Sequence, residues 1–231
     1  TTGATSRGEA TISSVDLDAR TITLNVLPAG TTGTDVIWHK GAYGNEFAGI
    51  HKILTNTGTL FNISATDYSL WKGNSQSAGS IPLSLATVEK AVGKGVAKGL
   101  DEDVSVYVSI YAWNDLLSEQ AAKRQYDSSY SSAQLENGAK SIKFYGMNGM
   151  ITVIPTIYVK EGFAYVLCEQ DWVKIGSTDV TFKRPAGTGG EDTYFRDLEN
   201  SAGFELRCLA DIALFCQRPG VGTVVTAIVN S

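Results

Sequence analysis

The chain decides its fold in residues 142–228, which read as a succession of strands. The strand segments are IKFYGMNGMITVIP (142–155), GFAYVLCEQDWVKIG (162–176), DVTFKR (179–184), DTYFRDL (192–198), GFELRCLADIALFCQRPG (203–220) and GTVVTAIV (222–229). The strand formers Val, Ile, Phe, Tyr and Thr dominate them, and Gly, Asn-Gly and Pro separate them. No metal-binding motif, nucleophile triad or phosphate loop interrupts this sequence. The pattern favours a structural or surface role over catalysis.

Composition limits the possible functions. The 231 residues suffice for one large domain or two small ones, and a chain of this size can form a stable core without disulfide bonds or metal ions. Charged residues make up 19%, below the usual share of about 25%. The net charge of −5 argues against nucleic-acid binding as the main task, since phosphate contacts need clustered Lys and Arg. The one basic concentration, Lys90, Lys94 and Lys98, has the spacing of a solvated helix face.

Cysteine usage and hydropathy indicate the folding compartment. Cys168, Cys208 and Cys216 are an odd number, each within an apolar strand segment, which predicts buried reduced thiols and folding in a cytoplasm. The sequence leaves open a Cys208–Cys216 disulfide within one hairpin. There is no run of 18 apolar residues and no signal-peptide pattern, so a soluble chain is expected.

The N-terminal part is predicted to hold short strands and loops. Residues 1–8 are small and polar and suit an arm or a frayed end. The expected elements are strands at 9–15 and 21–27 joined by a turn at 16–19, a loop at 28–33, a strand at 35–40, a helical turn at 49–54 and a linker at 72–80.

Two longer helices are predicted in the middle of the chain. Apolar spacing predicts the first at 83–96, with Ser84 as N-cap and Gly99 as C-cap, although Gly93 and Gly95 each disfavour it by about 1 kcal/mol. A strand at 104–110 follows. The second helix is predicted at 113–126, and a polar loop at 127–140. For that second helix we expect a cap from Asn114 or Asp115 and an ion pair between Glu119 and Lys123.

Residues that could carry chemistry are few. General acid–base catalysis near neutral pH most often uses histidine, and the chain has only His39 and His51, both in segments that suit packing or surface roles. The segment 93–99 (GKGVAKG) lacks the order of a phosphate loop and closes a helix instead of opening one. Asn62 begins a glycosylation sequon, but nothing else indicates secretion.

Acidic residues give no better candidate. Asp16 with Asp18, and the run 101–103, suit solvated turns and match no calcium-loop spacing. The pairs Asp115/Glu119 and Glu169/Asp171 are the candidates for the two carboxylates of a glycosidase. A surface ion pair with Lys123 is the simpler interpretation of the first pair. For the second pair, the sequence does not determine the distance between the two carboxylates. We therefore predict no catalytic, cofactor-binding or metal-binding residues and no cofactor.

The order of elements resembles the major capsid protein of tailed bacteriophages, the Hong Kong 97-type fold. ATISSVDLDARTITL (10–24) is similar to an opening strand pair, and the loop-rich stretch 33–73 ends in a Tyr-x-x-Trp-x-Gly phrase at Tyr68, Trp71 and Gly73. A helix at 83–98, a strand, a Trp-x-x-Leu-Leu helix at 113–126, the Phe-x-Gly step at 144–146 and a closing strand pair near Arg218-Pro-Gly follow in order. The N-terminal arm and long spine helix that usually precede these elements in the family are not visible in this sequence, so either the helix at 83–98 or the helix at 113–126 could take the place of the spine helix. No matching Lys/Asn motif supports a covalent cross-link.

The resemblance implies an α+β fold with a peripheral lobe of sheet plus helix and an axial lobe around 104–175. The expected division is 1–80 for the N-terminal strands, loop-rich insert and linker, 81–175 for the helix and axial-type lobe, and 176–231 for the closing strands of the peripheral-type lobe.

The resemblance also implies a function, that of a virion subunit which folds in the host bacterial cytoplasm. Such a subunit assembles into pentamers and hexamers around double-stranded DNA, which it meets only by weak non-specific contact. Scaffolding, portal or decoration proteins are further partners, and no membrane is involved. We expect contacts between subunits at loops 28–34, 72–80 and 127–140. The alternatives are a β-rich binding module, such as a phage tail or adhesin domain, and an enzyme with an unrecognised site.

Overall fold

The computed structural model describes residues 6–17, 19, 21–124, 142–147, 149–182, 195–198, 200–206 and 208–230. The chain divides into two compact units, Thr1–Phe47 and Ala48–Ser231. The three-part division expected from the sequence stays a prediction. No helix of the described residues is long and apolar enough to cross a membrane.

The first unit is built on one hairpin. Strand β1 (Ile12–Asp16) pairs antiparallel with β2 (Thr21–Leu24), and Asp16 accepts a hydrogen bond from the backbone N–H of Ala19 in the turn. Both strands were predicted, with slightly different bounds. The strand predicted at 35–40 is wrong. The Asp35 carboxylate binds the backbone N–H of Thr32 at 2.7 Å, a local side-chain bond that favours a turn over a sheet ladder.

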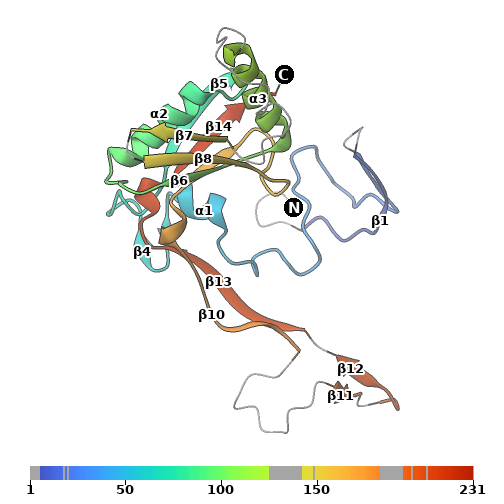
Figure 1. The fold of residues 1–231 in the computed structure, drawn as a ribbon. Helices are drawn as coiled ribbons and strands as arrows, with labels where there is room; N and C mark the ends of the chain where they lie inside the picture. The colour runs from blue at the N-terminus through green and yellow to red at the C-terminus, as the bar shows by residue number, and fades with distance from the viewer. Residues whose placement is uncertain are drawn as a thin grey trace, which may run out of the picture. The chain divides into compact units, whose positions relative to one another are not determined.

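The second unit contains a six-stranded mixed sheet (Figure 1). Its strands, from edge to edge, are β5 (Asn74–Ile81), β14 (Thr223–Ile228), β9 (Ala164–Leu167), β6 (Val104–Val108), β8 (Gly149–Pro155) and β7 (Ile142–Gly146). The pairs β5–β14 and β6–β8 are parallel, and the other neighbours are antiparallel. The strands predicted at 104–110 and across 142–228 are therefore largely present.

Strand β5 corrects the linker predicted at 72–80. The segment NSQSAGSI has little strand propensity, yet it pairs in parallel with β14 from Asn74 to Ile81. The Asn74 side chain also donates to the carbonyl of Gly220 at 2.8 Å, and Ala78 is buried. Contacts with a distant part of the chain thus override a turn-like composition.

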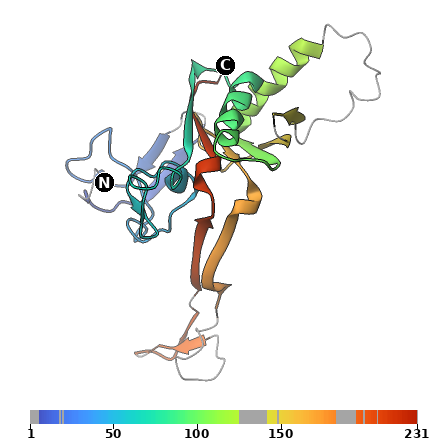
Figure 2. The same ribbon diagram turned by 90° about the vertical axis from the view of Figure 1, so that its left-hand side faces the viewer.

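Helices cover both faces of the sheet unequally. Helices α2 (Leu85–Val96) and α3 (Ile110–Arg124) pack on one face, where Val106, Val153 and Val166 are buried with side chains of both helices. Figure 2 shows these two helices on the same side of the sheet. The short helix α1 (Ile50–Leu54) packs on the opposite face, where Leu54 contacts Leu167 and Val224. The strict alternation of buried residues in β6 matches the period of a strand with two different faces.

The helix ends only partly follow the sequence. Ser84 caps α2 as predicted, because its hydroxyl accepts a hydrogen bond from the N–H of Thr87. The Glu119 carboxylate of α3 accepts a second one from the N–H of Leu85 at 2.9 Å, which ties the two helices together. The Lys123 side chain lies outside the described residues.

Helix α3 begins earlier than predicted. The Ser109 hydroxyl accepts a hydrogen bond from the N–H of Ala112, so the helix continues directly from β6. Asn114 and Asp115 therefore lie inside the helix, and the prediction that one of them caps it is wrong. Asp115 is buried at 8% exposure, so it is not part of a solvated surface pair either.

The remaining elements are short apart from one pair of strands. They are β3 (Thr59–Leu60), β4 (Ile63–Ser64), β11 (Phe195–Asp197), β12 (Phe204–Leu206) and the short 3-10 helices η2 (Glu169–Asp171) and η3 (Pro219–Val221). Strands β10 (Trp172–Thr181) and β13 (Leu209–Cys216) pair with each other, and with no other described strand, in a two-stranded antiparallel sheet that we name the ribbon. Figures 1 and 2 show the ribbon leaving the end of the six-stranded sheet.

Two glycines of α2 allow a matched test of its packing. A Cβ on Gly95 would meet the carbonyl oxygen of Val221 at 2.4 Å, whereas a Cβ on Gly93 would meet only the flexible end of Met147 at 3.7 Å. We predict that Gly95→Ala lowers the free energy of unfolding by about 1–3 kcal/mol because the helix must shift. Gly93→Ala is expected to raise it by up to about 1 kcal/mol through helix propensity. Urea unfolding of both variants checks this, and equal effects of the two substitutions would contradict the packing.

Candidate functional site

The ribbon is the longest two-stranded sheet of the second unit, and among the described residues no second sheet or helix is paired with it along β10 and β13. Its register is regular from Trp172↔Cys216 to Ile175↔Ala213 and then shifts twice, before Thr178 and before Thr181. The first shift contains Gly176, whose φ is +149°, and a Cβ there would meet the carbonyl oxygen of Asp211 at 1.9 Å. Glycine is therefore required at this bulge, which bends and twists the ribbon.

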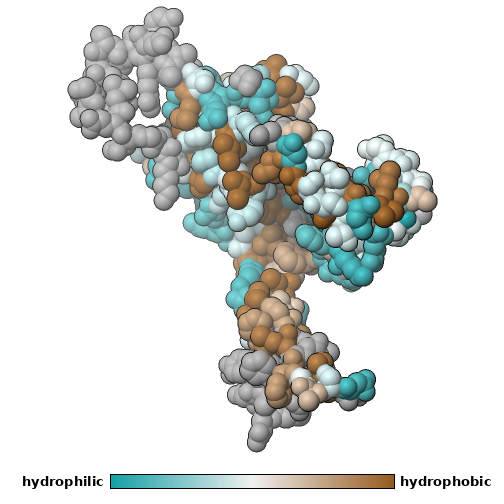
Figure 3. All heavy atoms as spheres, turned by 90° about the vertical axis from the view of Figure 1, so that its right-hand side faces the viewer, coloured by the Kyte–Doolittle hydropathy of each residue, from teal (hydrophilic) through white to brown (hydrophobic). Residues whose placement is uncertain are grey.

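Apolar side chains stay exposed along the ribbon. They are Val173 at 37%, Ile175 at 42%, Val180 at 64% and, just past β10, Phe182 at 46%. In Figure 3, brown apolar spheres follow the ribbon in the lower half of the picture. A two-stranded hairpin by itself is marginally stable in water, and its free edges invite further pairing. The exposed surface of the ribbon thus suits contact with another protein surface.

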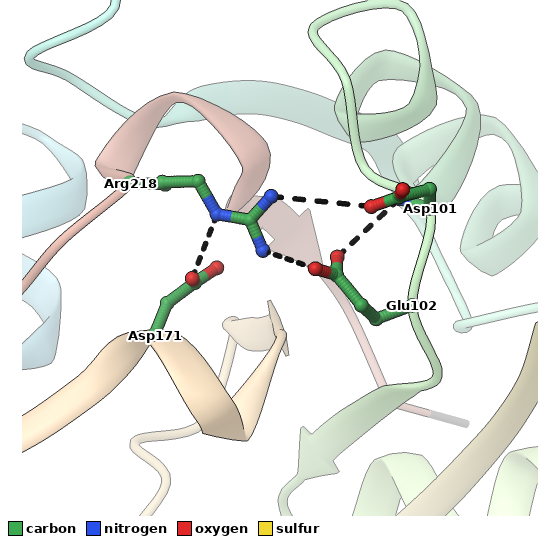
Figure 4. A network of polar contacts seen from close by, with 4 residues as sticks. All are labelled: Asp101, Glu102, Asp171 and Arg218. Atoms are coloured by element: carbon green, nitrogen blue, oxygen red, sulfur yellow. Dashed lines mark hydrogen bonds and ion pairs between the residues drawn. The ribbon is translucent and has the colours of Figure 1, made fainter.

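One arginine fixes the base of the ribbon to the sheet. Arg218, two residues after the end of β13, donates from Nε to Asp171 Oδ1 at 2.7 Å and from Nη2 to Glu102 Oε1 at 2.6 Å (Figure 4). Its Nη1 lies 4.0 Å from Asp101 Oδ1. Asp171 ends η2 before β10, and Glu102 precedes β6. The guanidinium therefore joins three segments that are far apart in the sequence.

The charges of this cluster stabilise one another. The hydrogen bonds to Asp171 and Glu102 raise the pKa of the Arg218 guanidinium, and the hydrogen bond from Arg218 lowers the pKa of Glu102. Asp171 is only 6% exposed at its side chain, whereas Arg218 is 40% exposed. The second oxygen of Asp171 is buried without a hydrogen-bond partner among the described residues. The Asp171 charge thus depends on Arg218 for its compensation.

Aromatic side chains hold the ribbon at a second point. The Phe215 ring lies 5.3 Å from the Phe61 ring and 6.0 Å from the Trp71 ring, measured between centroids. Trp71 in turn donates from Nε1 to the carbonyl of Leu60 at 3.0 Å. Phe61 and Asn62 both have positive φ, 52° and 64°, in the turn between β3 and β4. A phenylalanine in this backbone conformation is strained, and the ring contact of Phe61 with Phe215 offsets part of that strain.

The carboxylates of Glu169 and Asp171, which sequence could not place, have separate partners. Glu169 accepts a hydrogen bond from the Tyr107 hydroxyl at 2.6 Å. Hydrogen bonds from Ser105 and Tyr107 lower the pKa of Glu169, while burial and the bond to Glu169 raise the pKa of Tyr107 to about 12. Asp171 pairs with Arg218 instead. Both side chains therefore hold the end of β9 and η2 in place.

The histidines lie in different units. His51 contacts the Tyr165 hydroxyl through Nδ1 at 3.1 Å and packs edge-on against the Phe163 ring, which is the packing role predicted for it. His39 lies in the first unit, after Trp38, whose ring packs against Tyr43. Within the described ranges, no group of three or more His, Cys, Asp or Glu side chains is placed to hold a metal ion.

The other predicted candidates are spread over the chain. Asp16 lies in the hairpin turn of the first unit, and Asp18 lies outside the described residues. Of the three lysines predicted to share a helix face, Lys94 donates to the carbonyl of Ser75, and Lys98 follows the end of α2. Asn62 lies at the β3–β4 turn. In the sequence analysis Arg218 is noted only as part of an Arg-Pro-Gly phrase. Its partners Asp171 and Glu102 could not be predicted, because they lie 47 and 116 residues away in the sequence.

All three cysteines are free thiols, and they differ in burial. Cys168 and Cys216 are buried, as predicted, but Cys208 is exposed, so the prediction is wrong for that residue. The Cys208–Cys216 disulfide that the sequence left open is not formed. Burial raises the pKa of Cys216 to about 12 and also raises that of Cys168.

We predict that loss of Arg218 destabilises the second unit. Arg218→Met leaves the Asp171 carboxylate buried without its cation and is expected to lower the free energy of unfolding by about 2 kcal/mol, a value reduced by the partial exposure of the arginine. The matched control is Lys174→Met, which removes an ion pair to Asp179 whose side chains are 59% and 70% exposed. That control should leave the free energy of unfolding almost unchanged, because solvent screens an exposed ion pair. Denaturant unfolding compares the two, and equal losses would show that the Arg218 cluster has no special role.

Thiol labelling provides a second check on the packing at the base of the ribbon. A thiol reacts as the thiolate, so a buried thiol with a raised pKa is inert in the folded chain. In native protein near neutral pH we expect a maleimide to modify Cys208 quickly, and Cys168 and Cys216 only after unfolding. Mass spectrometry of labelled peptides gives the answer, and rapid native labelling of Cys216 would contradict the structure.

Comparison with known proteins supports one type of fold. No family model matches the sequence, and no curated protein matches it. Among solved structures, the fold is similar to a chain from the cyanophage A-1(L) capsid asymmetric unit, with a TM-score of 0.50 and 16% sequence identity. The match covers 74% of this chain and 56% of that chain, so this chain spans little more than half the length of its capsid counterpart. At this identity the likeness shows the fold alone: a mixed sheet with few helices, an α+β arrangement similar to that of a phage capsid protein.

Proposed function

We propose that this chain is a structural subunit of a bacteriophage capsid and that it has no enzymatic task. The observation that carries the proposal is the fold likeness to a cyanophage capsid chain over 74% of this sequence. In this proposal the chain acts in the virion, through contacts with copies of itself.

The ribbon supports the proposal from the physical side. It presents exposed apolar residues on a strand pair with no second layer, and its base is held by Arg218 and by the Phe215 aromatic contacts. A fixed base with an uncovered surface suits an element that is covered by a neighbouring subunit. Because many copies repeat the same contact in a closed shell, each contact needs only modest free energy.

The finer proposal is a shell of the Hong Kong 97 type. The axial-type lobe would be built on β6, α3 and β8, and the peripheral-type lobe would include β10 and β13. Subunits would form pentamers and hexamers that enclose double-stranded DNA, aided by scaffolding, portal or decoration proteins. Of the three loops expected to make contacts, 28–34 lies in the first unit, 72–80 is mostly edge strand β5, and 127–140 lies outside the described residues.

Assembly of the purified chain tests this function. We expect light scattering and negative-stain microscopy to show capsomers, sheets or shells as the protein concentration rises. Val180→Lys should raise the concentration needed for assembly about tenfold or more, because it puts a charge in place of an exposed apolar side chain that a neighbouring subunit would bury. Val180→Leu is the matched control, since it keeps the apolar surface, and it should assemble like the original chain.

Two outcomes would oppose the proposal. A monodisperse monomer at all protein and salt concentrations would favour the alternative of a β-rich binding module. Normal assembly of Val180→Lys would remove the ribbon from the contact surface.

A further inference from the structure

A groove beside the base of the ribbon has an apolar lining and charged side chains of both signs. Its volume is about 770 Å³, and it lies between residues 62–71 and 217–221. Its apolar lining includes Ile63, Leu70, Trp71 and Val221, and its charged lining consists of Asp67, Lys98 and Arg218. Arg218 is already paired with Glu102 and Asp171, whereas Asp67 and Lys98 have no ion pair within the described part of the chain. A pocket of this size and character suits an apolar segment with a few polar groups.

A turn at the other end of the sheet has the complementary character. Ile157 is 74% exposed and Tyr158 is 91% exposed, side by side in the connection between β8 and β9. Lys160 follows them and is also exposed, without an ion pair among the described residues. We name Ile157, Tyr158 and Lys160 the knob. Two adjacent, largely exposed side chains with apolar surface on one turn suit a contact site.

The knob is held firmly by its neighbours. The N–H of Thr156 donates to the carbonyl of Val108 at 2.9 Å, and the N–H of Tyr158 donates to the Thr156 hydroxyl at 3.3 Å. Val159, between the exposed residues, is buried at 8%. The turn is thus fixed before binding, which reduces the entropy lost in any complex.

The knob and the groove of one chain cannot meet. The knob lies near the C-terminal end of β6, because the adjacent Thr156 is hydrogen-bonded to Val108. The groove lies near the N-terminal end of β6, because Arg218, which lines it, binds Glu102 just before that strand. The five residues of β6 separate these ends by about 15 Å. A second copy is the partner that carries the missing surface, and a patch that fits a different patch on the same molecule produces head-to-tail association.

We propose that the knob of one copy docks in the groove of the next. Ile157 and Tyr158 cover the apolar lining around Leu70 and Trp71, and Lys160 pairs with Asp67. The Tyr158 hydroxyl offers an acceptor to the ammonium of Lys98. This contact rests on the proposed function, because it names a particular interface by which capsid subunits would join into rings.

Cross-linking in a Cys208→Ser background tests the contact. One chain carries Ile157→Cys and the other carries Ser69→Cys beside the groove, which leaves Tyr158 and Leu70 in place. Mixed with a bis-maleimide, these chains should give at least roughly tenfold more mixed dimer than Ile157→Cys mixed with Tyr145→Cys, because docking raises the local concentration. Tyr145 is the control because it is 84% exposed on β7, away from the groove.

A charge exchange tests the pairing of Lys160 with Asp67. Lys160→Glu in the Ile157→Cys chain, or Asp67→Lys in the Ser69→Cys chain, should each reduce the mixed dimer several-fold, and both together should restore it. Yields equal to the Tyr145 control, or no restoration by the double exchange, would overturn the inference. Light scattering on the same samples distinguishes the failure of this contact from the failure of the proposed function. If shells form but the mixed dimer does not, the knob–groove contact is rejected and capsid assembly is kept. If the chain stays a monomer, both are rejected.

Discussion

The two hydrogen bonds from Arg218 to Asp171 and Glu102 hold the second unit together at the point where its sheet meets the ribbon. They connect the start of β6, the end of η2 and the link between β13 and β14. The planar guanidinium can serve two carboxylates at fixed angles, which a lysine ammonium cannot do with the same geometry. The position of the ribbon, and of one wall of the groove, depends on this cluster.

A fixed base explains how the ribbon can exist with so little core of its own. Two strands without a second layer bury few of their side chains, and Val180 and Phe182 remain exposed. The Gly176 bulge adds twist, while Phe215 anchors the near end against Phe61 and Trp71. In the proposed capsid role, contact with other copies would supply the stabilising free energy that the ribbon lacks as a monomer.

Sequence reasoning predicted those parts of the fold that depend on local patterns. The alternation in 104–108, the Ser84 cap and the strands near the C-terminus follow from periodicity and capping chemistry. The segment 72–80 was misread as a linker because its pairing with β14 comes from residues almost 150 positions away. The Arg218 cluster and the groove could not be predicted for the same reason. Local composition carries no information about which distant carboxylates an arginine will meet.

Hydrogen exchange on the assembled chain is the most direct test of the claim that the ribbon is an inter-subunit element. Backbone amides of β10 should exchange at least roughly tenfold more slowly in assembled particles than in the unassembled chain, because a neighbour covers the ribbon. Amides of β6, already buried in the sheet, should change little. Equal exchange of β10 in particles and in free chains would contradict the account.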